Sequence, residues 1–165
     1  MINLNNILVP TDCSELSKEA TNYAIKFAKQ FQAKLTLLLV TPTEPLAVLN
    51  DYGYFSPELH QKLVLESTKR AEAELKEFWD TVADSEIPVK LVNAKGDPFT
   101  EIIRYAKENE TDIIIMGTHG HTGIKHILMG SVAEKVVRYS PQPVLTVKDK
   151  DYQFDVDDKI EQVGV

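Results

Sequence analysis

Residues 117–131, GTHGHTGIKHILMGS, combine residue types that bind phosphate with types that bind metals. Glycines such as Gly117 and Gly120 let the backbone adopt positive φ and approach a ligand closely. Gly130 and Ser131 come just before an apolar helical pattern, at a predicted helix N-terminus, where free N–H groups and the helix dipole favour an anion. The stretch therefore suits an anionic nucleotide.

The common nucleotide motifs are absent from this stretch. No glycine in it is followed by lysine, which excludes G-x-x-x-x-G-K-[ST]. The glycines run G-x-x-G-x-x-G, which differs from the dinucleotide pattern G-x-G-x-x-G. On the residues alone, a turn that needs glycine dihedrals remains an equal alternative.

Two other kinds of chemistry are disfavoured. His119, His121 and His126 have the donor atoms for zinc, but no cysteine lies nearby and a glycine loop is a poor rigid scaffold. We therefore expect no metal held by protein side chains. Ser131 lacks the G-x-S-x-G setting of an activated nucleophile, which favours phosphate binding over attack.

Asp12 and Cys13 form a second candidate group near the start of the chain. Asp12 follows Pro10 and Thr11, and its carboxylate suits ligand binding, general-base catalysis or helix capping. Cys13 is the only cysteine, so it forms no internal disulfide, in agreement with a reducing cytoplasm. Near a helix start a thiol pKa can fall, but a small residue at a tight turn is the favoured interpretation of Cys13.

Strand and helix patterns alternate along the chain. The expected strands are residues 4–9, ending at Pro10, then 35–40, 88–94, 112–116 and 143–147. The expected helices are 11–31, 58–83, one that begins at Asp97-Pro98, and 131–140. This alternation predicts an α/β fold with a five-stranded, mainly parallel sheet and helices on both faces.

Apolar spacing predicts which helix faces are buried. The first helix should bury Leu16, Ala20, Tyr23, Ala24, Phe27, Ala28 and Phe31. The second should bury Leu59, Leu63, Ala71, Leu75, Phe78 and Val82, with Trp79 in the core or at its rim. The helix that begins at Asp97-Pro98 should bury Phe99, Ile102, Ile103 and Ala106. The last helix should bury Val132, Val136 and Tyr139.

The strand order places the candidate groups relative to each other. Ligands of open α/β sheets bind at the carboxyl ends of the strands, where the strand order reverses. If the first and fourth strands are neighbours, the loop 10–12 faces the glycine stretch.

Composition excludes several classes of protein. The chain has 165 residues and a net charge of −7, and residues 149–165 hold six acidic and two basic residues. No basic field for nucleic acid exists, and no apolar run approaches the roughly 20 residues that span a bilayer. We expect one domain, 1–148, with an acidic tail, 149–165, and a cytoplasmic protein without a secretory signal.

The longer motif Gly117-x-x-Gly120, nine residues, then Gly130-Ser131 resembles the ATP-binding signature of the universal stress protein family. The surrounding IIIMGTHGHTGIKHILMGSVAEKVVRYSPQPVLTV, the opening ILVPTDCSELSKEA, the LLLV strand and GDPFTEIIRYAKENETDIIIMG share the resemblance. It covers about residues 4–148. The resemblance implies a Rossmann-like sheet of order 3-2-1-4-5 and a homodimer formed through Val144, Leu145, Thr146 and Val147.

The resemblance also implies roles for individual residues. Asp12 and the backbone at Val40 would hold adenine. The residues flanking adenine and ribose would be Pro10, Thr11, Met116 and Gly117. The residues around the phosphates would be His119, Gly120, Gly130, Ser131 and Val132, with Mg²⁺ bridging phosphate oxygens. His121 stands where many members carry arginine, so the ATP affinity is expected to be lower or more pH-sensitive, with Lys125 and His126 in partial compensation.

The implied function is that of an ATP-binding regulatory or stress-response protein. Two alternatives remain open. One is a slow enzyme that hydrolyses ATP or transfers its phosphate or adenylyl group. The other is a dimeric interaction module that binds no nucleotide. The sequence reveals neither the physiological stress nor the downstream partner.

Overall fold

The computed structural model describes residues 3–43, 56–82, 87–118 and 129–148. In this part of the chain, strands and helices alternate as the pattern predicts. The strands are β1 (Asn6–Thr11), β2 (Lys34–Thr41), β3 (Val89–Lys95), β4 (Ile113–Gly117) and β5 (Val144–Val147). The helices are α1 (Glu15–Phe31), α3 (Pro57–Val82), α4 (Pro98–Glu108) and α5 (Ser131–Tyr139).

The five strands form one sheet of order β3-β2-β1-β4-β5, with all neighbouring pairs parallel. The order 3-2-1-4-5 implied by the resemblance is thus confirmed. β1 and β4 are neighbours, and the strand order reverses between them. Ligands of open α/β sheets bind at such a reversal, at the carboxyl ends of the strands.

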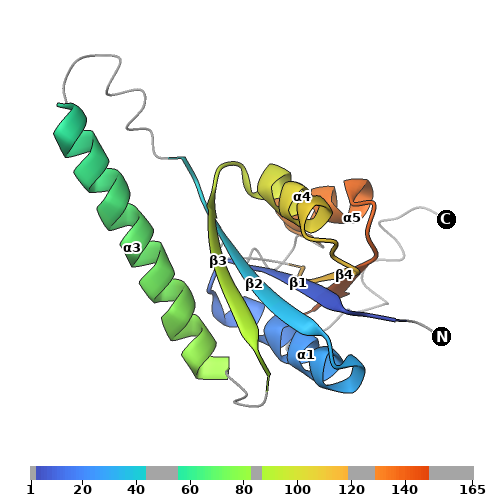
Figure 1. The fold of residues 1–165 in the computed structure, drawn as a ribbon. Coiled ribbons are helices and arrows are strands. Elements are labelled where there is room, and N and C mark those ends of the chain that lie inside the picture. The colour runs from blue at the N-terminus through green and yellow to red at the C-terminus, as the bar shows by residue number, and fades with distance from the viewer. Residues whose placement is uncertain (1–2, 44–55, 83–86, 119–128, 149–165) are drawn as a thin grey trace, which may run out of the picture.

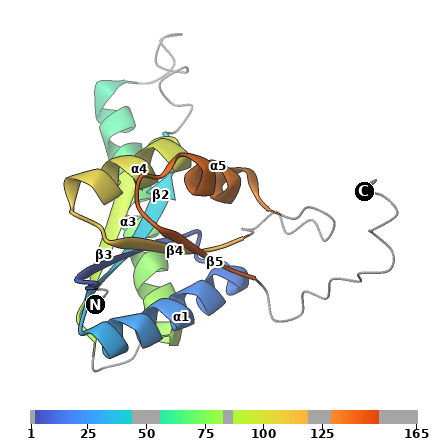
Figure 2. The same ribbon diagram turned by 90° about the vertical axis from the view of Figure 1, so that its right-hand side faces the viewer.

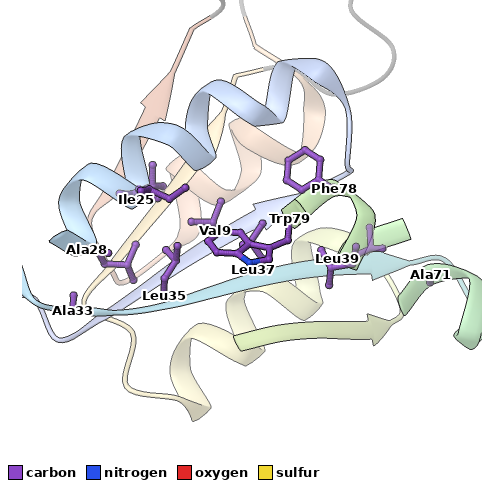
Figure 3. Packing of buried hydrophobic residues seen from close by; sticks show 14 residues of the cluster. Val9, Ile25, Ala28, Ala33, Leu35, Leu37, Leu39, Ala71, Phe78 and Trp79 are labelled. Carbon is purple, nitrogen blue, oxygen red and sulfur yellow. The ribbon is translucent and has the colours of Figure 1, made fainter. Parts of the chain in front are cut away.

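Helices cover both faces of the sheet. On one face, α1 and α3 pack against Val9, Leu37 and Ile115, with Phe78 and Trp79 of α3 in the same cluster (Figure 3). On the other face, α4 and α5 pack against Leu8, Leu38, Ile114 and Met116. Figures 1 and 2 show the sheet between α1 and the α4–α5 pair, with α3 running beside β3. Because successive side chains of a strand point to opposite faces, a sheet covered on both sides needs continuous apolar runs, as in Leu37–Leu39.

β1 continues through Pro10 instead of stopping before it. Asn5 O accepts from Lys34 N on the β2 side, and Asn6 O accepts from Asp112 N on the β4 side. Backbone groups alternate along a strand, so Pro10 directs its nitrogen toward β4. Pairing with β4 runs only through Ile7 and Leu8, so the missing N–H of proline breaks no ladder bond.

The buried face of α1 is rotated from the predicted one. Ser17 and Thr21 are buried, while Tyr23 and Phe31 are exposed. Both buried hydroxyls are hydrogen-bonded, Ser17 to Ser14 O at 2.9 Å and Thr21 to Ser17 O at 2.8 Å. Burial therefore costs these polar groups little, and apolar spacing alone misplaced the face.

Two further predicted core residues lie at the surface. Leu59 of α3 is 41% exposed, and the buried residues of α3 begin only at Ala71. The helix is longer than the strands, and its N-terminal half extends past them (Figure 1). Tyr139 of α5 is 62% exposed, where its ring contacts Phe99 edge-on. In the described residues, no helix is long and apolar enough to cross a bilayer.

Candidate functional site

A cavity of about 350 Å³ lies where the strand order reverses. This volume is in the range of small-molecule sites. The strands β1, β2 and β4 contribute through their carboxyl ends, and α1, α4 and α5 through their first turns. The lining residues are Pro10, Thr11, Asp12, Ser17, Leu38, Val40, Pro98, Ile102, Met116, Gly117, Thr118, Gly130, Ser131, Val132 and Ala133.

Segments predicted to form one site do meet in this cavity. The predicted residues among the lining are Pro10, Thr11, Asp12, Val40, Met116, Gly117, Gly130, Ser131 and Val132. They come from three strand ends and one helix that are far apart in the sequence. His119, Gly120 and His121 lie outside the described residues, as do Lys125 and His126.

Sequence reasoning missed six lining residues. They are Ser17, Leu38, Pro98, Ile102, Thr118 and Ala133. Ile102 was assigned only to the core, and its helix reaches the cavity because α4 packs beside α5. Ser17 had a local signal, a hydroxyl three residues after the capping serine, but it was left out of the predicted buried face of α1 because only apolar residues were counted there.

The two ends of the glycine stretch are held together by the backbone. Gly130 N donates to Thr118 O at 2.7 Å, and Thr118 N donates to Val147 O at 3.1 Å. Gly117 and Gly130 thereby line the same cavity although twelve residues separate them in the sequence. The first and last glycines of the motif therefore lie at two edges of the same cavity.

α5 begins differently from α1 and α4. Ser14 caps α1 by accepting from Ser17 N, and Asp97 caps α4 by accepting from Thr100 N. The N-cap of α5 is Gly130, which has no side chain to accept from the first turn. Ser131 follows, exposed at the cavity. The first N–H groups of α5 are therefore placed where a ligand anion can accept from them.

Among the described residues that line the cavity, Asp12 is the only ionisable one. Its Oδ1 accepts from Ser14 N at 3.1 Å, from Ser14 Oγ at 2.6 Å and from Ser17 Oγ at 2.8 Å. The carboxylate is thus fixed by the start of α1, while Ser14, rather than Asp12, is the helix N-cap. The helix-capping role considered for Asp12 is thus filled by Ser14.

Of the two interpretations of Cys13, the lowered thiol pKa is wrong. Burial, followed by the charges of Glu74 and Asp12, raises the pKa of Cys13 to about 12. The residue adopts a positive φ of 60°, and its thiol packs beside the cluster under α1 and α3. Loss of water and two nearby negative charges outweigh any effect of the helix start.

Metal ligands do not gather in the described residues. No group of three or more histidine, cysteine, aspartate or glutamate side chains that would hold an ion occurs there. The three histidines of the glycine stretch lie outside that part of the chain.

The comparisons with known proteins agree on one family. The sequence profile of the universal stress protein family matches residues 3–148. A universal stress protein of Methanocaldococcus jannaschii is 37% identical over 142 residues, which are 86% of this chain and 81% of that protein.

Solved structures show the same fold. UspA of Lactobacillus plantarum superposes with a TM-score of 0.70 at 28% identity, covering 89% of this chain and 99% of that one. A family protein of Arabidopsis thaliana, solved with AMP bound, has a TM-score of 0.57 at 20% identity, covering 93% and 97%. The profile spans the whole described sheet, including both edges of the glycine stretch. This chain belongs to the universal stress protein family.

Proposed function

We propose that this protein binds ATP and serves in the cytoplasm as a regulatory, stress-response binding protein. The observation that carries the proposal is the cavity between β1 and β4, which gathers nine residues that the family resemblance assigns to ATP. The AMP-bound relative supports it only at the level of the fold, which accommodates an adenine nucleotide in that protein.

The cavity chemistry suits a nucleoside. β2 and α4 contribute apolar side chains, Leu38, Val40 and Ile102, against which a base can pack. Thr11 and Asp12 add polar groups on the β1 side. Pockets of this kind bury the ligand against apolar walls and orient it with a few polar groups.

The phosphates would lie at the start of α5. Gly130 leaves the first N–H groups of the helix to the ligand, and the positive end of the helix dipole favours the phosphate charge. By the resemblance, His119, Gly120 and His121 would contribute as well. Mg²⁺ would bridge phosphate oxygens, because Asp12 is the only carboxylate in the described lining.

Binding without efficient turnover fits this lining best. A general base needs a carboxylate or imidazole within reach of the attacking water. Asp12 already accepts three protein donors on Oδ1, which makes it a positioning acceptor rather than a mobile base. Incubation of the pure protein with radiolabelled ATP should give no rapid release of ADP, AMP or labelled protein. Fast turnover would instead establish the enzyme alternative.

The variant Ser131→Glu tests the phosphate position. Ser131 is the first residue of α5 and exposed, so a carboxylate there favours the helix dipole while repelling a triphosphate. We expect ATP affinity to fall on the order of tenfold or more relative to Ser131→Gln, which has the same shape without the charge. Calorimetric titration with ATP, and with adenosine as the uncharged reference, measures the difference.

The thermal midpoint of both variants controls for folding. Equal ATP affinities of Ser131→Glu and Ser131→Gln would show that the phosphates do not lie at the start of α5. Failure of ATP to bind the wild-type protein, together with no nucleotide in the gently purified sample, would remove the proposed function itself.

We also propose that two copies pair through β5. β5 is an edge of the sheet, and its side chains Val144, Leu145, Thr146 and Val147 are each only half-buried in the single chain. An apolar edge strand is normally paired or protected. Pairing of two β5 strands would extend the sheet across both copies.

A further inference from the structure

The apolar part of the cavity lies on the α4–α5 side of the sheet. Six lining residues belong to, or pack against, the apolar cluster that α4 and α5 form with the sheet. Among the described lining residues, none belongs to the cluster under α1 and α3. The six residues are Leu38, Val40, Ile102, Met116, Val132 and Ala133. A ligand that enters at the strand ends therefore buries its apolar part between the sheet and these two helices.

One face of α4 runs from the cavity into the core. Pro98, Ile102 and Ala106 follow one another at intervals of four residues, so their side chains share a face of the helix. Pro98 is half-buried and Ile102 is 2% exposed, and both line the cavity. Ala106 is 0% exposed in the same cluster and does not line the cavity. Along this face the cavity therefore ends at Ile102.

Ile102 differs from the other deeply buried apolar residues of the lining. Leu38 and Met116 belong to strands, where the hydrogen-bonded backbone of the sheet closes the cavity behind the side chain. Ala133 has only a methyl group, so its side chain fills little of the space. Behind Ile102, the next side chain on the same face is the methyl group of Ala106. The side chain of Ile102 is thus the part of the lining that limits how far the cavity reaches along α4.

We propose that Ile102 is the specificity-determining residue that sets the depth of the cavity and excludes nucleotides with a bulky group on the base. The inference rests on the proposed function and deepens it. With the phosphates at the start of α5, the base is the part of the nucleotide that enters the apolar end of the cavity. C2 and the 6-amino nitrogen are the positions of adenine far from the ribose, so a group added there must find room beside Ile102.

Close packing makes this limit firm. Side chains in a packed core have little room to move, so an added group on the base overlaps with Ile102 and cannot displace it cheaply. Truncation to alanine removes three carbon atoms next to the small side chain of Ala106. Because a truncated core site collapses only partly, the space released should join the existing cavity.

The test compares ATP with two analogues, N6-benzyl-ATP and 2-benzylthio-ATP. Calorimetric titration at one pH, salt and magnesium concentration gives the dissociation constants for the wild type and Ile102→Ala. We expect the wild type to prefer ATP over both analogues. Ile102→Ala should lower the analogue/ATP ratio of dissociation constants by roughly tenfold or more for at least one analogue. The analogue that gains identifies the edge of the base that faces α4.

Val136→Ala is the matched control. Val136 is 0% exposed in the same cluster but does not line the cavity. Its truncation should lower the thermal midpoint, as Ile102→Ala does, and leave both ratios as in the wild type. Ile102→Val removes only one methyl group and should shift the ratio less, in the same direction. It provides the test if the alanine variant does not fold.

The outcomes separate this inference from the proposed function. Unchanged ratios for both analogues in the folded Ile102 variants, with ATP still bound, overturn the role of Ile102 and leave ATP binding intact. The same gain in Val136→Ala assigns the effect to a loosened core and also overturns that role. A wild type that binds the analogues as tightly as ATP overturns it as well. A wild type that binds no nucleotide overturns the proposed function itself.

Discussion

At the scale of single residues, Cys13 shows how three dimensions reverse a local expectation. It follows Asp12 and precedes a helix, a setting that lowers a thiol pKa in many proteins. Here the thiol packs against the core cluster that α1 and α3 share, and the charge of Glu74 acts on it, so burial and like charge raise the pKa of Cys13 to about 12. The neutral thiol is therefore the stable form in the folded protein.

Cys13 should consequently alkylate slowly. In the native protein the iodoacetamide rate should rise about tenfold per pH unit from pH 8 to 10, because the thiolate fraction follows the raised pKa. In the urea-unfolded chain, measured in parallel, the alkylation rate should level off above pH 9.0, the ordinary pKa of the thiol. A native rate that levels near pH 9 would contradict the burial of the thiol.

The same raised pKa predicts how stability depends on pH. The folded state holds the thiol proton more tightly than the unfolded chain does. Stability from this group is therefore fully present below pH 9 and falls as the pH rises from 9 toward 12. Denaturant titration of wild type and Cys13→Ala across this range isolates the contribution.

At the scale of elements, the β3–α4 junction sets the position of α4 and hence of Pro98 and Ile102 at the cavity. Gly96 has a φ of +147°, and its N–H donates to Thr41 O at 3.0 Å, which continues the pairing with β2. A Cβ at this glycine would lie 2.8 Å from Oε1 of Glu101, a buried carboxylate that pairs with Arg104. Both the backbone and the available space therefore require glycine.

Gly96→Ala should destabilise the protein by about 1–3 kcal/mol, since alanine rarely adopts this φ and its methyl group displaces Glu101. Urea unfolding monitored by Trp79 fluorescence measures the change. A double-mutant cycle with Glu101→Ala separates the clash from the backbone strain. If Glu101→Ala relieves none of the loss, strain alone explains it.

At the scale of the whole molecule, the proposed pairing of two copies depends on the outer edge of β5. Ile114 N donates to Pro143 O, and Thr118 N donates to Val147 O. Backbone groups alternate along a strand, so the groups of Thr146 point away from β4. No strand of the described residues lies on that side, so the outward N–H of Thr146 can pair with a second copy without disturbing the sheet.

Thr146→Pro should convert the dimer to a monomer with little loss of monomer stability, because proline removes an outward donor and leaves the β4 ladder intact. Light scattering after size exclusion measures the mass. Thr146→Val, which keeps the N–H, should remain dimeric. A monomeric wild type would contradict the dimer. A Thr146→Pro variant that stays dimeric would show that the interface lies elsewhere.

The residue pattern by itself determined the elements, and the family resemblance supplied the strand order with its reversal point. Continuous apolar runs such as LTLLLV require burial on both faces, and alternation with amphipathic helices then requires a parallel sheet. Asp97-Pro98 predicted the start of α4 because capping is a local interaction, and Asp97 does accept from Thr100 N. The glycine spacing likewise identified both edges of the cavity before the edges were known to meet.

Only the tertiary structure decided what each side chain contacts. Whether Ser17 faces solvent or Asp12 depends on the rotation of α1 against the sheet, which apolar spacing fixed wrongly because hydrogen-bonded hydroxyls can be buried. The pKa of Cys13 depends on Glu74, sixty-one residues away in the sequence. Ile102 reaches the cavity because α4 packs beside α5. Local patterns determine elements because their causes are local, whereas long-range packing determines the site.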